Sequence, residues 1–240
     1  LVFLYLIWSL EIYALSRKRY FMLSFGWGMV AFFIALTIQD AFIDAQILSY
    51  VDISVFGAPA LEEMLKAALL ILLMQTMTLR YAVDGTTYGF AVGTGFAITE
   101  NLFYITIGAN DAFTSVILRI FSVSLMHAFN SAIIGTVAGT SSFQGSRVRV
   151  SRMVFVVLLA IIIHAVFNVI ALSAQAWALI AMTISIGLGG TLTLILIAKY
   201  SARREGESIR RALDEKLTAG ELAAVVSPMD IAVIIDIHNC

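Results

Sequence analysis

The side chains of this sequence that are best suited to chemistry lie inside long apolar stretches rather than between them. An ionisable group inside a membrane-spanning helix is costly to place, which makes it a candidate for function. The candidates are three carboxylates, two imidazoles and one amide, namely Glu62, Glu63, Glu100, His127, His164 and Asn168. These groups suit hydrolysis of an amide bond, because a carboxylate can activate water while imidazole and amide groups bind the water and the developing oxyanion.

Two other chemistries use the same residue types. Carboxylates and imidazoles form ion or proton relays in membrane transporters. Two histidines and a glutamate, here His127, His164 and Glu62, form a common ligand set for catalytic zinc. The spacing favours a glutamate-activated water without a metal, because the two histidines come from different stretches and Asn168 follows His164 by one helical turn. No cofactor is therefore expected, and zinc is the alternative.

The composition indicates a membrane protein. Of the 240 residues, 60% are hydrophobic and only 13% are charged, and the mean hydropathy is +0.95. A soluble domain has about 45–50% apolar and about 25% charged residues, so a water-soluble single domain is excluded. A net charge of −1 argues against a nucleic-acid partner, and the single cysteine, Cys240, excludes an internal disulfide.

Seven apolar stretches approach or reach the roughly 20 residues that a membrane span needs. All should be helices, because in lipid only helices and closed barrels pair every backbone group. The predicted fold is therefore an all-α polytopic membrane helix bundle, with a transmembrane domain over residues 1–200 and a tail over 201–240. The predicted spans are residues 1–15, 20–39, 57–78, 86–107, 120–138, 153–172 and 177–198.

The tail differs in character from the spans. Ile209, Leu213 and Leu217 recur at helical spacing among charged residues, which predicts a short amphipathic cytoplasmic helix. The apolar run 231–235 is too short to span a membrane and is interpreted as the start of a further segment.

The basic residues predict the orientation of the bundle. They follow spans one, three, five and seven, at 17–19, Arg80, 147–152 and 199–204, whereas the loop 40–52 carries three aspartates. Cytoplasmic loops are enriched in Lys and Arg. The N-terminus is therefore expected outside and the C-terminus inside a prokaryotic plasma membrane.

The candidate side chains are predicted to share one depth in the membrane. At about 1.5 Å rise per residue, the ionisable candidates of four different spans lie roughly 8–13 Å below the outer ends of their helices. A common depth on four helices has no explanation in separate local roles. Helix packing is therefore expected to bring these groups into one cavity in the outer half of the membrane.

Several known intramembrane protease chemistries are excluded by absence. No His-Glu-x-x-His motif occurs, since His127 and His164 are each followed by alanine. No aspartate pair lies within the spans, and Gly95 is followed by Phe96 rather than by aspartate. No serine occupies a convincing nucleophile turn.

The remaining motifs resemble those of a known family. They are Glu62-Glu63-x-x-Lys66, Phe96-x-x-x-Glu100-Asn101, His127 with Gly135 eight residues on, and His164-x-x-x-Asn168. Their order and spacing resemble the PrsW family of bacterial intramembrane proteases, within the larger group that includes the type II CAAX prenyl endopeptidases. The resemblance covers about residues 55–175.

This resemblance implies an intramembrane endopeptidase. In it Glu62 would be the base, with Glu63 or Glu100 as alternatives, and His127 would help to hold the water. His164 and Asn168 would bind the oxyanion. The implied substrate is a membrane-anchored protein, an anti-sigma factor that is cut first on the extracytoplasmic side, and the outer-half depth agrees with that side.

The alternative function is an ion- or proton-coupled transporter with a Glu/His relay. Such a transporter is expected to show inverted internal repeats and broken helices, and the sequence shows no repeat. The expected partners are therefore a membrane-anchored protein substrate and the lipid bilayer.

Overall fold

A computed structural model describes most of the apolar part of the chain. The described residues are 18–76, 78–79, 81–107, 113–142, 145–173, 177–178, 180–190, 192, 196, 207, 210–211 and 215. The predicted span 1–15, the tail residues Ile209, Leu213 and Leu217, and the run 231–235 lie outside them. The chain divides into two compact units, residues 1–194 and 195–240, and all the helices below belong to the first.

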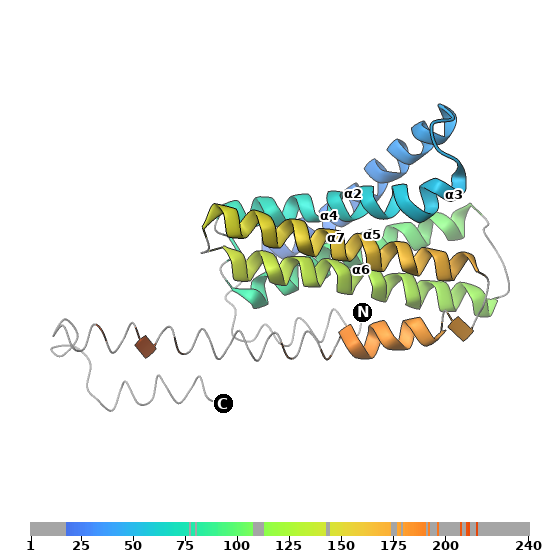
Figure 1. Cartoon of the computed structure of the whole chain (residues 1–240). Helices are drawn as coiled ribbons and strands as arrows, with labels where there is room; N and C mark the ends of the chain where they lie inside the picture. The colour runs from blue at the N-terminus through green and yellow to red at the C-terminus, as the bar shows by residue number, and fades with distance from the viewer. Residues whose placement is uncertain are drawn as a thin grey trace. The chain divides into compact units, whose positions relative to one another are not determined.

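The ordered elements in the described part of the chain are helices, which confirms the all-α class (Figure 1). A further short helix covers residues 180–190. The labelled elements are α2 (Lys18–Asp44), α3 (Tyr50–Asp52), the π-helical turn η2 (Ile53–Gly57), α4 (Ala58–Gln75), α5 (Ala82–Thr106), α6 (Phe113–Ser141) and α7 (Ser146–Leu172).

Five of the predicted spans coincide with the helices α2, α4, α5, α6 and α7. Three helical segments are long and apolar enough to cross a membrane, namely α2, residues Ile117–Ser141 of α6, and α7. Helix α4 is shorter, with 18 residues, and carries the three charged groups Glu62, Glu63 and Lys66. The helical nature of these stretches is confirmed, whereas the count of seven spans stays a prediction.

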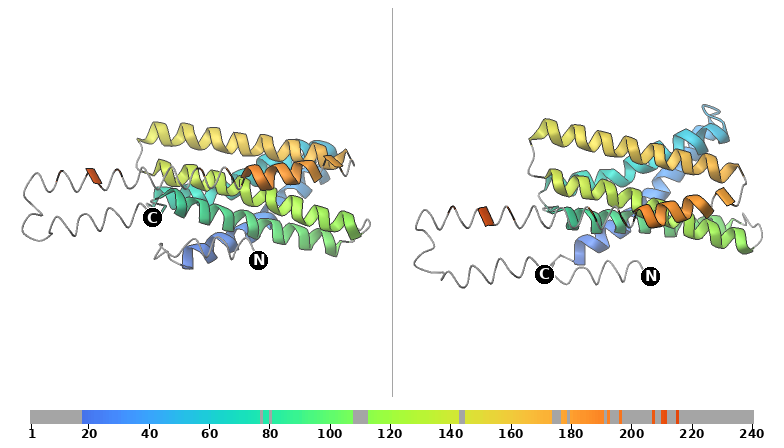
Figure 2. Two further views of the ribbon diagram at one scale, coloured as in Figure 1. Left: turned by 90° about the horizontal axis from the view of Figure 1, so that it is seen from below. Right: turned by 60° about the horizontal axis from the view of Figure 1, so that its bottom comes forward.

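Helix α5 packs against α6 and α2. Figure 2 shows α7, α6 and α5 side by side, and α2 packs against α5 as well. Helix α4 contacts α2, α5, α6 and α7. Because α4 contacts helices on several sides, the polar residues on it face other helices rather than the surface.

Glycines allow α5 and α6 to approach closely. A Cβ added at Gly85, Gly89 or Gly93 would collide with the backbone carbonyls of Gly135, Ser131 and His127 of α6, respectively. These three glycines recur every four residues, so they lie on one face of α5, the face that packs against α6. Small residues let membrane helices gain van der Waals contact, and here they also bring the backbone of His127 against α5.

The start of α4 has a local explanation in its sequence. The turn η2 runs directly into α4, and Pro59 lies in the first turn of α4. Proline lacks the N–H that a continuous α-helix would pair with the carbonyl four residues earlier, and its ring would clash with that carbonyl. A wider π-helical turn before Pro59 accommodates both effects.

The basic residues at the starts of two helices lie at the same end of the bundle. Tyr20 at the start of α2 stacks near Tyr88 of α5 with ring centroids 6.3 Å apart, and Ser142 after α6 donates to the carbonyl of Leu79. The basic starts of α2 and α7 therefore lie at the end where α4 leads into α5. Asp40 lies near the opposite end of α2.

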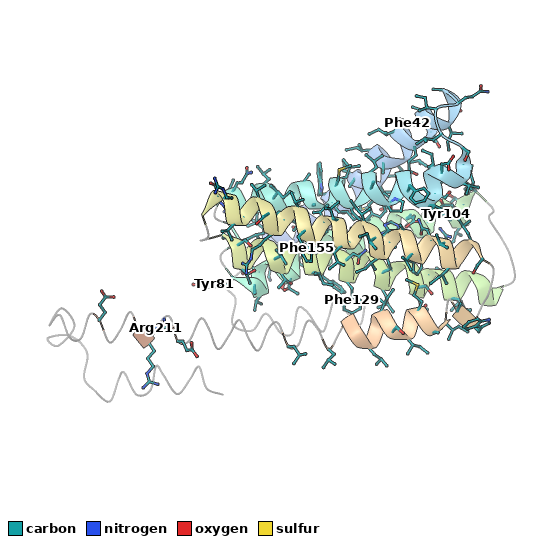
Figure 3. The ribbon with its side chains drawn as sticks, in the orientation of Figure 1. Phe42, Tyr81, Tyr104, Phe129, Phe155 and Arg211 are labelled. Atoms are coloured by element: carbon teal, nitrogen blue, oxygen red, sulfur yellow. The ribbon has the colours of Figure 1, made fainter. Side chains whose placement is uncertain are left out.

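The outer faces of the helices carry large apolar side chains, as lipid-facing surfaces do. Phe155 of α7 and Phe42 of α2 are labelled among them in Figure 3. Phe155 is 69% exposed and Leu158 one turn further is 53% exposed. Their exposure suits a hydrocarbon environment rather than water.

Candidate functional site

The structure brings five of the six predicted site residues into one connected cluster. The cluster draws Glu62 and Glu63 from α4, Glu100 from α5, His127 from α6 and His164 from α7. The convergence expected from their common depth is thereby confirmed. The sixth residue, Asn168, bonds elsewhere.

Lys66 and Glu63 form the innermost part of this cluster. The Lys66 Nζ atom lies 2.6 Å from Glu63 Oε1, and both side chains are fully buried. The same Nζ lies 2.7 Å from His127 Nδ1 and 4.6 Å from the centre of the Phe96 ring. A buried ammonium needs such partners, because an unpaired charge away from water is strongly unfavourable.

Lys66 determines which nitrogen of His127 carries the proton. An ammonium only donates hydrogen bonds, so His127 Nδ1 accepts from Lys66 and the neutral ring carries its hydrogen on Nε2. That N–H donates to Glu100 Oε2 over 2.8 Å. Both ring nitrogens of His127 are therefore engaged.

Glu100 is held at the edge of the cluster by a second cation. Arg119 of α6 donates to Glu100 Oε1 over 3.3 Å, and its guanidinium lies 4.1 Å from the centre of the Tyr104 ring. The Arg119 side chain is 42% exposed, whereas that of Glu100 is 14% exposed. Arg119, a basic residue just before the predicted span 120–138, thus belongs to the site.

His164 directs its Nε2 atom, a hydrogen-bond acceptor when the ring carries its hydrogen on Nδ1, towards Glu62. Its Nδ1 lies 3.0 Å from Glu63 Oε1, and a carboxylate oxygen only accepts, so the neutral ring carries its hydrogen on Nδ1. The other nitrogen, Nε2, lies 3.8 Å from Glu62 Oε2. Two hydrogen-bond acceptors therefore face each other across a gap too long for a direct bond.

Glu62 has a partner from outside the predicted motifs. Gln39 of α2 donates from Nε2 to Glu62 Oε1 over 3.1 Å. The side chain of Glu62 is 12% exposed, compared with 0% for Glu63. Glu62 is thus the more accessible of the adjacent glutamates, which agrees with its predicted role as the base.

Asn168 lies one helical turn beyond His164, but its amide nitrogen donates to the backbone carbonyl of Ser54 over 2.8 Å. Ser54 belongs to η2, the π-helical turn that leads into α4. This bond ties α7 to the start of the helix that carries Glu62. The amide of Asn168 keeps a second hydrogen for another acceptor.

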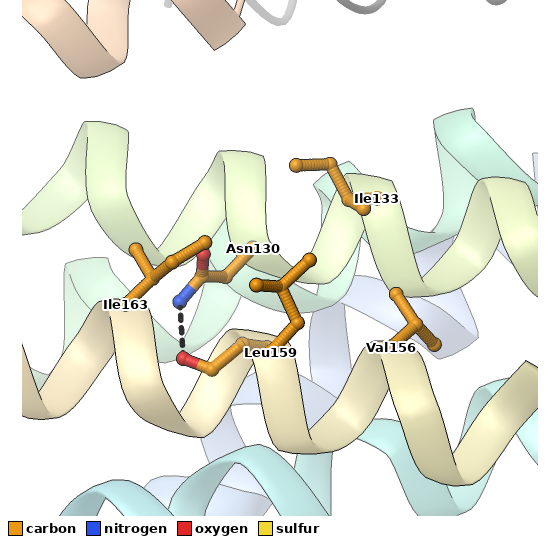
Figure 4. Close-up of a pocket in the computed structure, with 6 residues that line it drawn as sticks. Asn130, Ile133, Val156, Leu159 and Ile163 are labelled. Atoms are coloured by element: carbon orange, nitrogen blue, oxygen red, sulfur yellow. Dashed lines mark hydrogen bonds between the residues drawn. The ribbon is translucent and has the colours of Figure 1, made fainter.

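Asn130 of α6 is a polar residue that the structure keeps outside the cluster. Figure 4 shows it beside a small, mostly apolar pocket between α6 and α7, with its amide donating to the carbonyl of Ala160 over 3.1 Å. An interhelical hydrogen bond of this kind stabilises packing in a membrane. No charged group lines this pocket.

Glu62, His127 and His164 also form a candidate metal site, since one ligand atom from each lies within 4.8 Å of the others. His164 fits a ligand well, because Glu63 accepts its other N–H as carboxylates commonly do beside metal-bound histidines. His127 fits less well, because a metal-bound histidine usually donates its second N–H, whereas Nδ1 here faces the Lys66 ammonium. The three residues thus are of the types that bind a catalytic metal, but the hydrogen bonding of His127 does not suit a metal ligand.

Sequence reasoning missed Gln39 and did not assign Lys66 or Arg119 to the site. Lys66 was visible as a lysine in an apolar stretch, although pairing at three-residue spacing explained it locally. Gln39 stood at the last position of its predicted span, where a polar residue is ordinary. Only contact with Glu62 distinguishes it.

The fold and site together define a helical membrane protein with a buried glutamate–histidine centre. The chain belongs to the PrsW family, because the model described as "PrsW family intramembrane metalloprotease" matches residues 16–199.

A curated relative supports the same assignment. The chain is 27% identical over 156 residues to "Protease PrsW" of Clostridioides difficile (strain 630), across 64% of this chain and 65% of that protein. The match thus spans slightly less than two thirds of the relative's length. No solved structure matches the chain significantly.

Proposed function

We propose that this protein is an intramembrane endopeptidase that hydrolyses a peptide bond of a membrane-anchored protein with a glutamate-activated water. The observation that carries the proposal is the pair of acceptors Glu62 Oε2 and His164 Nε2, 3.8 Å apart. A water molecule between them can donate one hydrogen to each. The water oxygen is then left with its lone pairs directed away from both partners, ready to attack a carbonyl carbon.

In the proposed reaction Glu62 takes a proton from the water as its oxygen bonds to the carbonyl carbon. Collapse of the tetrahedral intermediate breaks the C–N bond, and Glu62 returns the proton to the leaving amine. His164 acts as the second acceptor for the water, and both ring nitrogens of His127 are engaged by Lys66 and Glu100. Stabilisation of the oxyanion therefore falls to the free amide hydrogen of Asn168. This differs from the sequence-based expectation, which paired His164 with Asn168.

Substitution of Glu62→Gln tests this proposal. Glutamine keeps the size and hydrogen bonding of glutamate but cannot accept the proton, so cleavage should fall by about 10²-fold or more. Cleavage is measured on a co-expressed single-span anti-sigma factor with a cytoplasmic tag, by the size of the tagged fragment. Glu63→Gln and Glu100→Gln are the matched variants. Proteolysis that survives in all three would refute the glutamic mechanism.

A metal-assisted version of the same reaction is the second candidate, since Glu62, His127 and His164 cluster as a ligand set. A bound divalent metal would act as a Lewis acid that acidifies water. The test is elemental analysis of the purified active protein together with cleavage after a membrane-permeant chelator. We expect cleavage to persist. Stoichiometric zinc, whose removal abolishes cleavage and whose return restores it, would favour the metal.

The proposed substrate is an anti-sigma factor that is cut on the extracytoplasmic side. This proposal goes one step beyond membership of the PrsW family.

We further propose seven spans with the N-terminus outside, a protease domain over 1–200 and a cytoplasmic tail over 201–240. The basic starts of α2 and α7 at one end of the bundle, with Asp40 near the opposite end of α2, support this orientation. In a Cys240→Ser background, an impermeant thiol reagent added outside should label Gln46→Cys and spare Arg147→Cys.

A further inference from the structure

We infer that Gln39 of α2 is a positioning residue that orients the carboxylate of Glu62, so the site extends to a fifth helix. This inference rests on the proposed function, because it assigns a task to the partner of the proposed base. The evidence is the hydrogen bond from Gln39 Nε2 to Glu62 Oε1, 3.1 Å long and partly buried.

Gln39 continues the packed face of its helix. Ala31, Phe32 and Ala35 of α2 are buried, and Phe32 packs on Phe96 of α5 with ring centroids 5.6 Å apart. Gln39 follows Ala35 by four positions, so it lies on the same face one turn further along. The apolar face of α2 thus ends in a polar side chain where it meets Glu62.

Helix α2 is fixed against its neighbours, which gives Gln39 a defined place. Trp27 Nε1 donates to the carbonyl of Leu65 on α4 over 2.9 Å. A Cβ at Gly28 would collide with the carbonyl of Val92 on α5. The α2 backbone therefore packs closely on α5 and is tied by a hydrogen bond to α4. A donor on such a helix can hold a carboxylate in one orientation.

The two oxygens of Glu62 consequently have different tasks. Oε1 is held by Gln39, and Oε2 faces His164 Nε2 at 3.8 Å. Turning the carboxylate about its last bond out of this orientation would break the bond to Gln39. Gln39 thereby keeps Oε2 directed at the proposed water, and no other donor to Oε1 occurs among the described contacts. Small errors in the placement of a reacting group are enough to slow an enzyme strongly.

The test compares three variants of α2 in proteoliposomes with a tagged single-span anti-sigma factor as the probe. Gln39→Met keeps the length of the side chain and removes the donor, so kcat should fall about 10-fold while KM and the unfolding temperature stay unchanged. Gln39→Glu replaces the donor with a second carboxylate, so its kcat should fall further than that of Gln39→Met. Thr37→Val, two residues away on the exposed face, should behave as the wild type.

The split between kcat and KM separates positioning from a structural role. Equal loss of stability and activity in Gln39→Met, or an unchanged kcat, would overturn the inference. Glu62→Gln measured in the same vesicles tells the two proposals apart. If Glu62→Gln abolishes cleavage and Gln39→Met does not slow it, only the role of Gln39 fails. If Glu62→Gln cleaves normally, the proposed role of Glu62 as the base fails, and the role of Gln39 falls with it.

Discussion

The two halves of the bundle are built from the same helices by different means. Towards one end, α4, α5, α6 and α7 meet through apolar side chains such as Leu70, Tyr88, Ile134 and Val156, all buried. Towards the other end, the same four helices meet through carboxylates, imidazoles and a lysine.

The difference between these halves shows what the site requires of its scaffold. The apolar half needs only complementary shape, whereas each buried charge in the polar half needs a specific partner. One buried carboxylate oxygen, Glu63 Oε2, still has no hydrogen-bond partner among the described residues. The polar half therefore depends on exact pairing of its charged groups, and the packing of the apolar half stabilises the helix positions that the site needs.

The largest expected effect comes from breaking the central ion pair. Lys66→Met leaves the carboxylate of Glu63 buried without its cation, which costs about 3–5 kcal/mol in the free energy of unfolding. Unfolding in mixed micelles measures this loss. The double variant Glu63→Gln/Lys66→Met removes both charges, so it should regain much of the stability while remaining inactive. A double variant as unstable as Lys66→Met would show that the charge itself is not the cause.

The glycine contacts between α5 and α6 allow a matched comparison of the two halves. Gly93→Ala forces a methyl group against the carbonyl of His127, and Gly85→Ala forces one against the carbonyl of Gly135. Both should destabilise the protein by about 1–3 kcal/mol, since each overpacks a helix contact. Only Gly93→Ala should also slow cleavage by the folded protein, because it displaces His127. If the two variants show the same turnover per folded molecule, the contact between Gly93 and His127 has no specific effect on the site.

The smallest effects concern single interhelical hydrogen bonds. Thr136 and Thr86 join α6 to α5 through their hydroxyls over 2.6 Å, and Asn168 joins α7 to Ser54. Thr136→Val and Asn168→Ala should each lower the free energy of unfolding by about 0.6 kcal/mol, and in any case by less than about 2 kcal/mol. Thr136→Val should leave kcat unchanged, whereas Asn168→Ala should lower it, because it removes a proposed oxyanion donor and loosens the start of α4. An unchanged kcat in Asn168→Ala would confine Asn168 to packing.

The sequence by itself determined the helices and the chemistry of the candidate residues. The long apolar stretches could only be helices if they cross a membrane, and charged groups within them stand out because such groups are rare there. The constant rise of a helix also placed Glu62, Glu100, His127 and His164 at one depth before their contacts were known. For these residues no tertiary information was needed.

The tertiary structure alone decided which side chains meet and through which atoms. The partners of His127, namely Lys66 on Nδ1 and Glu100 on Nε2, depend on how the glycine face of α5 seats α6. The bond from Gln39 to Glu62 joins residues 23 positions apart on two helices, and the bond from Asn168 to Ser54 joins residues 114 apart. Helical periodicity fixes the depth of a residue, but the rotation of each helix about its axis follows from side-chain packing against its neighbours, which no single stretch of sequence contains.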